Sequence, residues 1–173
     1  MNLYLMGFMG TGKTRVGQSI ARKTGWQFID TDQCISEDAG MSIPEIFEKM
    51  GEPYFRELEK KWVKKTSKGS QQVISLGGGA VVDEENWEII HTHGVTVTLS
   101  YPATIIAERL ARKKDRPLLN NDDAEERLKQ IKHLMDKRHA LYQKADFILH
   151  LNKEQPVDQV AQAIISLIGD LYD

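Results

Sequence analysis

A glycine-rich segment near the N-terminus limits the folds open to this chain. Residues 7–14 read Gly-Phe-Met-Gly-Thr-Gly-Lys-Thr and fit the pattern G-x-x-x-x-G-K-[ST]. The segment follows a short apolar run and precedes residues 13–24, whose apolar side chains recur at helical spacing. In a strand–loop–helix unit of this kind, backbone N–H groups and the helix N-terminus form an anion site. The sequence therefore predicts phosphate binding by Gly10, Thr11, Gly12, Lys13 and Thr14, with Lys13 on the β- and γ-phosphates and Thr14 on a magnesium ion.

Strand-like and helix-like segments alternate along the rest of the chain. The expected strands are 3–7, 26–30, 72–76, 95–100 and 147–151. The expected helices are 13–24, 43–50, 53–68, 83–92, 103–113, 124–142 and 156–171. This alternation predicts one α/β domain with a parallel sheet, in which ligands bind where the strands end. The length of 173 residues fits one domain.

Two carboxylates follow the second expected strand, in the sequence Asp30-Thr31-Asp32. If this segment is extended, both side chains point to the same side. One could then hold magnesium, and the other could accept a hydrogen bond from an attacking hydroxyl. Aspartates at strand ends also cap helices and form turns. Their place beside the phosphate loop favours the functional interpretation.

Glycines and arginines complete the set of candidate residues. Gly77-Gly78-Gly79 directly follows the third expected strand, which favours close approach of a ligand to the backbone. Arg56, Arg116 and Arg138 stand in separate polar segments. Arginine forks match the oxygens of carboxylates and phosphates, so these three are candidates for binding anions.

A GTPase switch is the main rival class for such a loop. Its base-reading motif N-K-x-D has a counterpart in Asn152-Lys153-Glu154-Gln155, but the final aspartate is missing. Glutamine cannot supply the bidentate carboxylate that guanine needs. The third strand also ends in glycines and lacks an aspartate for magnesium. These differences reject the GTPase.

The combination of motifs resembles the shikimate kinase family, a P-loop group similar to the nucleoside monophosphate kinases. The resemblance covers nearly the whole chain. It rests on GFMGTGKT, Asp30-Thr31-Asp32, G-E-x-x-F-R-x-x-E ending at Glu59, Gly77 to Gly79, Arg116-Pro117-Leu118-Leu119, and Arg138 with Leu141-Tyr142.

The resemblance implies a three-layer α/β/α fold whose five-stranded parallel sheet has the order 2-3-1-4-5. It also implies a single domain over 1–173, with a substrate-binding helical region at about 32–61 and a mobile lid at about 112–123. The activity it implies is transfer of the ATP γ-phosphate to the 3-hydroxyl of shikimate, giving 3-phosphoshikimate and ADP. That step leads towards chorismate and the aromatic amino acids.

Roles for individual residues also come from the resemblance. The catalytic residues it implies are Lys13, Asp32 and Arg116, with Asp32 as the candidate base and Arg116 on the phosphates. Shikimate is expected to contact Asp32, Arg56, Gly77, Gly78, Gly79 and Arg138, with the arginines on its carboxylate. Asp30 would support magnesium beside Thr14. ATP would also contact Arg109, which would pack on adenine, and Gln155 and Arg15, although Arg15 is expected to point away from the phosphates.

Composition adds expectations about partners and location. The formal net charge of −2 lacks the basic excess of a nucleic-acid binder. No run approaches the ~18 apolar residues of a membrane span, and the single cysteine, Cys34, suits a reducing cytosol. We expect a cytoplasmic monomer whose partners are ATP and shikimate.

Two alternatives remain open at this point. A kinase for another small acid, such as gluconate, would not need the glycine triplet together with Arg56 and Arg138. A nucleotide-binding module without catalysis should have lost Lys13, Asp32 or Arg116, and all three are present.

Overall fold

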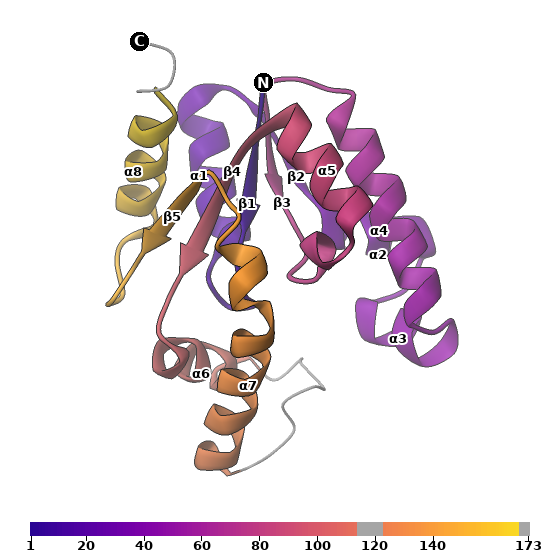
Figure 1. Cartoon of the computed structure of the whole chain (residues 1–173), viewed down its shortest axis with the longest axis vertical. Helices are drawn as coiled ribbons and strands as arrows, with labels where there is room; N and C mark the ends of the chain where they lie inside the picture. The colour runs from indigo at the N-terminus through magenta and orange to yellow at the C-terminus, as the bar shows by residue number, and fades with distance from the viewer. Residues whose placement is uncertain (114–122, 170–173) are drawn as a thin grey trace.

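The core of the protein is a five-stranded parallel sheet (Figure 1). A computed structural model describes residues 1–113 and 123–169. The strands are β1 (Asn2–Met6), β2 (Gln27–Asp30), β3 (Gln72–Ser75), β4 (Gly94–Ser100) and β5 (Phe147–His150). Their order is β2-β3-β1-β4-β5, as predicted. All five residues of β1 are buried at the centre of the sheet, so the loop that follows β1 begins from a fixed position.

Helices cover both faces of this sheet. They are α1 (Lys13–Thr24), α2 (Thr31–Ala39), α3 (Ile43–Lys49), α4 (Glu52–Ser67), the 3₁₀ turn η1 (Ala80–Val82), α5 (Glu84–His93), α6 (Ala103–Ala111), α7 (Ala124–Tyr142) and α8 (Val157–Gly169). Helices α1 and α8 pack together on one face, and α4 and α5 pack together on the other (Figure 1). The three-layer arrangement is the one expected.

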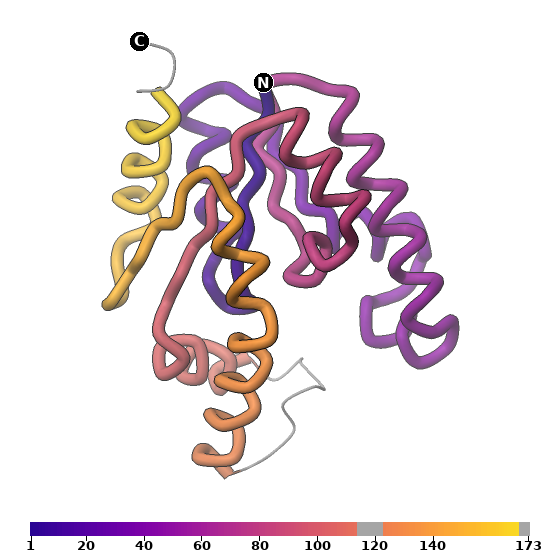
Figure 2. Tube along the Cα trace, in the orientation of Figure 1, coloured from indigo at the N-terminus to yellow at the C-terminus, as the bar shows by residue number. Residues whose placement is uncertain are grey.

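Two helical groups project beyond the edge at which the strands end. One contains α2 and α3, and the other contains α6 and α7 (Figure 2). Helices α2, α3 and α4 share a small core of their own around Ile35, Ile46 and Phe55. This group coincides with the expected helical region at 32–61, whose role in substrate binding stays a prediction. In the expected lid, residues 114–122 lie outside the described part of the chain, and Arg116 is among them.

The Asp30-Thr31-Asp32 segment is not extended, so the condition under which both carboxylates would point to the same side is not met. Helix α2 begins at Thr31. The local sequence pattern does not predict it, although it lies within the helical region at about 32–61 that the resemblance implies. Asp30 is its N-cap, and the Asp30 carboxylate accepts hydrogen bonds from the backbone N–H groups of Asp32 and Gln33. The capping tendency of aspartate therefore decided the local structure. The capping box at Ser42 and Glu45, which was predicted, is present at the start of α3.

No helix in the described ranges 1–113 and 123–169 is long and apolar enough to cross a membrane.

The packing of α1 on the sheet makes Gly17 a test of this fold. A methyl group at Gly17 would lie 2.6 Å from the Phe28 ring and 3.2 Å from Leu5. We expect Gly17→Ala to lower the melting temperature by about 2–6 °C, because overpacking at so short a contact costs about 2–3 kcal/mol and exceeds the gain of about 1 kcal/mol in helix propensity.

The matched control is Gly169→Ala at the end of α8, where the new methyl would have no neighbour within 4 Å among residues 1–113 and 123–169. Thermal unfolding followed by circular dichroism measures both variants. Equal or higher stability of Gly17→Ala would contradict the packing described for α1.

Candidate active site

The phosphate loop connects buried β1 to α1 and has the conformation that anion binding requires. Gly10 and Gly12 have φ angles of 80° and 88°, in the left-handed region that favours glycine. The buried Thr11 hydroxyl donates to the Phe8 carbonyl at 2.8 Å. The Lys13 ammonium donates to the carbonyls of Gly7 at 2.8 Å and Phe8 at 3.1 Å. Contacts within the loop therefore hold Lys13 over it.

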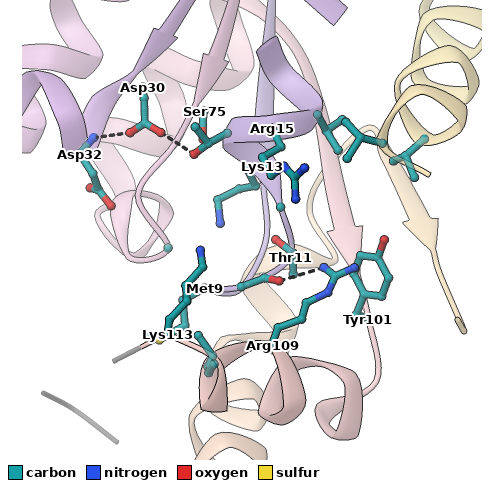
Figure 3. A pocket seen from close by; sticks show the side chains of 18 of the residues that line it. Met9, Thr11, Lys13, Arg15, Asp30, Asp32, Ser75, Tyr101, Arg109 and Lys113 are labelled. Atoms are coloured by element: carbon teal, nitrogen blue, oxygen red, sulfur yellow. Dashed lines mark hydrogen bonds between the residues drawn. The ribbon is translucent and has the colours of Figure 1, made fainter. Parts of the chain in front are cut away.

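A cavity of about 440 Å³ opens above this loop (Figure 3). Asp30 and Asp32 lie on one side of it, Arg109 and Tyr101 on the other, and Lys13 between them. The described residues expected to bind ATP all line it, namely Gly10, Thr11, Gly12, Lys13, Thr14, Arg15, Arg109 and Gln155. Arg15 was expected to point away, yet it is part of the cavity lining.

Asp30 faces the first turn of α1. The Thr14 hydroxyl donates to Asp30 Oδ2 at 2.6 Å, while Oδ1 of the same carboxylate caps α2. A hydroxyl and a carboxylate side by side are hard oxygen donors of the kind that magnesium prefers. These two residues fit the expected metal site.

Two carboxylates converge on Gly77, which is buried. A methyl group at Gly77 would lie 2.5 Å from Asp32 Oδ1 and 3.3 Å from Glu59 Oε2. The Gly77 N–H donates to the Thr31 hydroxyl at 3.1 Å, which ties the glycine to the start of α2. A side chain at this position would occupy the space that the carboxylates use.

Arginines approach the next two glycines. A methyl group at Gly78 would lie 3.1 Å from Arg138 Nη1, and the Tyr142 hydroxyl donates to the Gly78 carbonyl at 2.7 Å. A methyl group at Gly79 would lie 2.7 Å and 2.8 Å from the two Nη atoms of Arg56. None of the three glycines has a positive φ angle, so space, and not backbone conformation, requires glycine here.

Glu59 is a site residue to which the sequence interpretation gave no role. Its carboxylate is buried, and Oε1 accepts a bond from Arg56 Nη1 at 2.8 Å. Burial raises the pKa of Glu59, and the bond to Arg56 opposes that rise. The signal was present in the spacing, because Arg56 and Glu59 stand three residues apart on one helix face.

Glu154 is a second residue that received no role. Arg109 Nε and Nη2 donate to the two Glu154 oxygens at 2.9 Å and 2.5 Å, and Nη1 donates to the Gly10 carbonyl at 2.9 Å. The bond from Arg109 lowers the pKa of Glu154. No sequence signal pairs these two residues, which stand 45 positions apart.

Comparison with known proteins agrees with this geometry. The profile of the shikimate kinase family matches residues 9–169. The chain belongs to the shikimate kinase family. A shikimate kinase from Thermodesulfovibrio yellowstonii is 43% identical over 164 residues, covering 95% of this chain and 92% of that protein.

Solved structures of shikimate kinases superpose closely on the chain. The enzyme from Acinetobacter baumannii in complex with shikimate has a TM-score of 0.89 and 34% identity, covering 99% of this chain and 94% of that one. The enzyme from Bacteroides thetaiotaomicron has a TM-score of 0.90 and 32% identity, covering 98% of both chains. The fold inferred from the sequence is therefore the fold of this family.

The pairing of Arg56 with Glu59 predicts a stability loss that depends on pH. Arg56→Met leaves the Glu59 carboxylate buried without its cation, which costs about 3 kcal/mol at neutral pH. The pKa of Glu59 in the folded protein then rises further above its value in the unfolded chain. As the pH increases, Glu59 therefore loses its proton in the unfolded chain before it does so in the folded protein. The destabilisation should therefore grow between pH 5 and pH 8.

Urea unfolding across that pH range measures this effect, and the double variant Arg56→Met, Glu59→Gln is the control. Removing the carboxylate should restore most of the stability and flatten the pH dependence. A loss that is the same at pH 5 and pH 8 would mean that Glu59 is not the cause.

Proposed function

We propose that the chain transfers the γ-phosphate of ATP to the 3-hydroxyl of shikimate, giving 3-phosphoshikimate and ADP. One observation carries the substrate assignment. Asp32, Arg56 and Arg138 all approach the glycine triplet that follows β3, at the edge where the phosphate loop also lies. One carboxylate and two guanidinium groups around bare backbone suit a small molecule that has both hydroxyl groups and a carboxylate.

The two ends of such an acceptor would meet different groups. Arg56 and Arg138 would bind the carboxylate through their forks, and Asp32 would accept hydrogen bonds from the hydroxyls. Arg56 is held by Glu52 and Glu59, so its position is set before any ligand arrives. The A. baumannii relative was solved with shikimate bound, which supports the choice of acceptor.

We infer that ATP enters this site with magnesium. Thr14 and Asp30 would hold the ion, because their oxygens lie 2.6 Å apart at the mouth of the phosphate loop. The ion would neutralise charge that develops on the phosphate oxygens. Binding through one carboxylate and the phosphates is the usual arrangement for magnesium in kinases.

The protein's own residues would supply positioning and charge. Phosphoryl transfer has a loose transition state, so these two contributions carry most of the catalysis. Asp32 orients the shikimate 3-hydroxyl towards the γ-phosphorus and accepts its proton as the new O–P bond forms. The bond from the γ-phosphorus to the bridging oxygen breaks, and ADP leaves. Lys13 spreads the charge on the transferred group, and Arg116, outside the described residues, is proposed to help it.

The alternatives differ in specific residues. A kinase for gluconate does not account for the three glycines that admit Asp32, Arg56 and Arg138. A module without catalysis does not account for Lys13 and Asp32 in one cavity. A cytoplasmic, monomeric enzyme without a nucleic-acid partner stays a prediction.

A coupled assay of ADP release tests the proposal. Purified protein, ATP and magnesium are combined with a panel of hydroxy acids that includes shikimate, quinate and gluconate. Shikimate should give the highest kcat/KM by a wide margin. Equal or faster turnover of another acid would replace the substrate, and ADP release that needs no acceptor would leave only an ATPase.

Substitutions of Asp32 and Asp30 should have different kinetic effects. Asp32→Asn should lower kcat by about 10²- to 10⁴-fold with little change in ATP affinity, because the amide cannot take the proton. Asp30→Asn should instead raise the magnesium concentration needed for half-maximal rate, since Asp30 faces Thr14. Steady-state kinetics with varied magnesium and calorimetry with ATP separate the two. Reversed phenotypes would exchange the roles of the two residues.

A further inference from the structure

The guanidinium of Arg109 is held on all three of its nitrogens. Nε and Nη2 bind the Glu154 carboxylate, and Nη1 binds the Gly10 carbonyl of the phosphate loop. A fork-to-fork pair of this kind fixes the plane of the guanidinium as well as its position. Arg109 is therefore set in orientation before a ligand enters the cavity.

Tyr101 supports one side of the same group. The Arg109 Cζ atom lies 4.1 Å from the centre of the Tyr101 ring, and Tyr101 is buried at the end of β4. Arg109 also lines the cavity, on the side away from Asp30 and Asp32 (Figure 3). The edges of the Arg109 guanidinium are hydrogen-bonded and one of its faces lies on Tyr101. The guanidinium therefore offers a ligand a flat, cationic face. Flat cationic surfaces of arginine stack on nucleobases.

The position of Arg109 in the cavity matches the far end of a nucleotide. The phosphates belong at Lys13 and Thr14, and the cavity continues from there to Arg109, Glu154 and Gln155. Because its N–H groups are engaged by Glu154 and Gly10, Arg109 is not oriented to grip a phosphate. Its orientation suits stacking on the nucleotide base.

We propose that Glu154 is a positioning residue for the nucleotide base. It acts through Arg109, which it holds flat between Tyr101 and the space that the base enters. The proposal rests on ATP as the phosphate donor. Under this proposal, Glu154 contributes to the preference of the site for a nucleotide over a polyphosphate that has no base.

Simple electrostatics predicts the opposite result for this residue. Glu154 brings a negative charge to a cavity that receives a polyanion, so removing that charge should strengthen the binding of every phosphate ligand. The positioning role predicts weaker binding of ligands that carry a base. The two effects have opposite signs for a nucleotide, which makes the proposal testable by one substitution.

The experiment measures dissociation constants of ADP and of inorganic tripolyphosphate by calorimetry, with magnesium, for wild type and Glu154→Gln. Glutamine keeps the size of the side chain but can no longer accept both donors of the fork. ADP should bind about three- to ten-fold more weakly, which is modest because the pair is partly exposed. Tripolyphosphate should bind equally or more tightly. The readout is the ratio of the two constants, which general damage to the site would leave unchanged.

Glu108→Gln is the matched control. Glu108 precedes Arg109 on α6, is exposed, and forms no ion pair with the residues that the structure describes. The same loss of charge there should leave the ratio at its wild-type value. A second comparison places Glu154→Gln in an Arg109→Ala background, where it should have no further effect on the ratio.

Several results would overturn the proposal. They are an unchanged ratio in Glu154→Gln, tighter binding of ADP whatever happens to tripolyphosphate, an equal loss for both ligands, and a full effect of Glu154→Gln without Arg109. The proposed function fails separately. Wild type that binds ADP but does not phosphorylate shikimate would refute the acceptor and leave this test intact, whereas wild type that binds neither ligand would refute nucleotide binding itself.

Discussion

The two oxygens of Asp30 connect the parts of the site. Oδ2 accepts from the Thr14 hydroxyl at the start of α1, and Oδ1 accepts from the first N–H groups of α2. One carboxylate therefore joins the phosphate loop to the helix that carries Asp32. Because α2 begins at this point, Asp32 lies in its first turn and faces Gly77 instead of extending β2. The distance between the proposed metal site and the proposed base depends on this connection.

The glycines after β3 show how close packing creates room for chemistry. Each of them stands where a Cβ atom would meet a functional side chain, which is Asp32, Arg138 or Arg56 in turn. These side chains belong to three different helices, α2, α7 and α4. Because the glycines have no Cβ atoms, all three side chains can approach the backbone of one short segment. Binding groups from distant parts of the chain can converge only because this segment occupies so little space.

Two of the cations in the site, Arg56 and Arg109, are held by carboxylates. Arg56 is paired with Glu52 and with the buried Glu59, and Arg109 is paired with Glu154. The cost of burying Glu59 is offset by its cation, and the pair in turn restricts Arg56 to one position. Both arginines are thus oriented before ligands bind, which lowers the entropy lost on binding.

Local sequence determined the units of this fold and most of its candidate residues. The order of strands and helices, the loop with Lys13 and Thr14, and the capping box at Ser42 could be predicted, because each depends on neighbours a few residues away. The order of the strands within the sheet came from the resemblance of the motifs to a known family. Helix α2 could not be predicted with the same ease, since Asp30 is equally suited to ending a strand and to capping a helix.

The tertiary structure alone decided which distant side chains meet. Nothing in the spacing of Arg109 and Glu154 shows that they pair, because the two residues are brought together by α6 and by the segment between β5 and α8. The sequence likewise displays Gly77 to Gly79 without showing that Asp32, Arg56 and Arg138 each approach a different one of them. Contacts of this kind depend on the path of the whole chain around the sheet. The sequence determines which residue types are available for the chemistry. The distances between them are set only when the helices pack on the sheet.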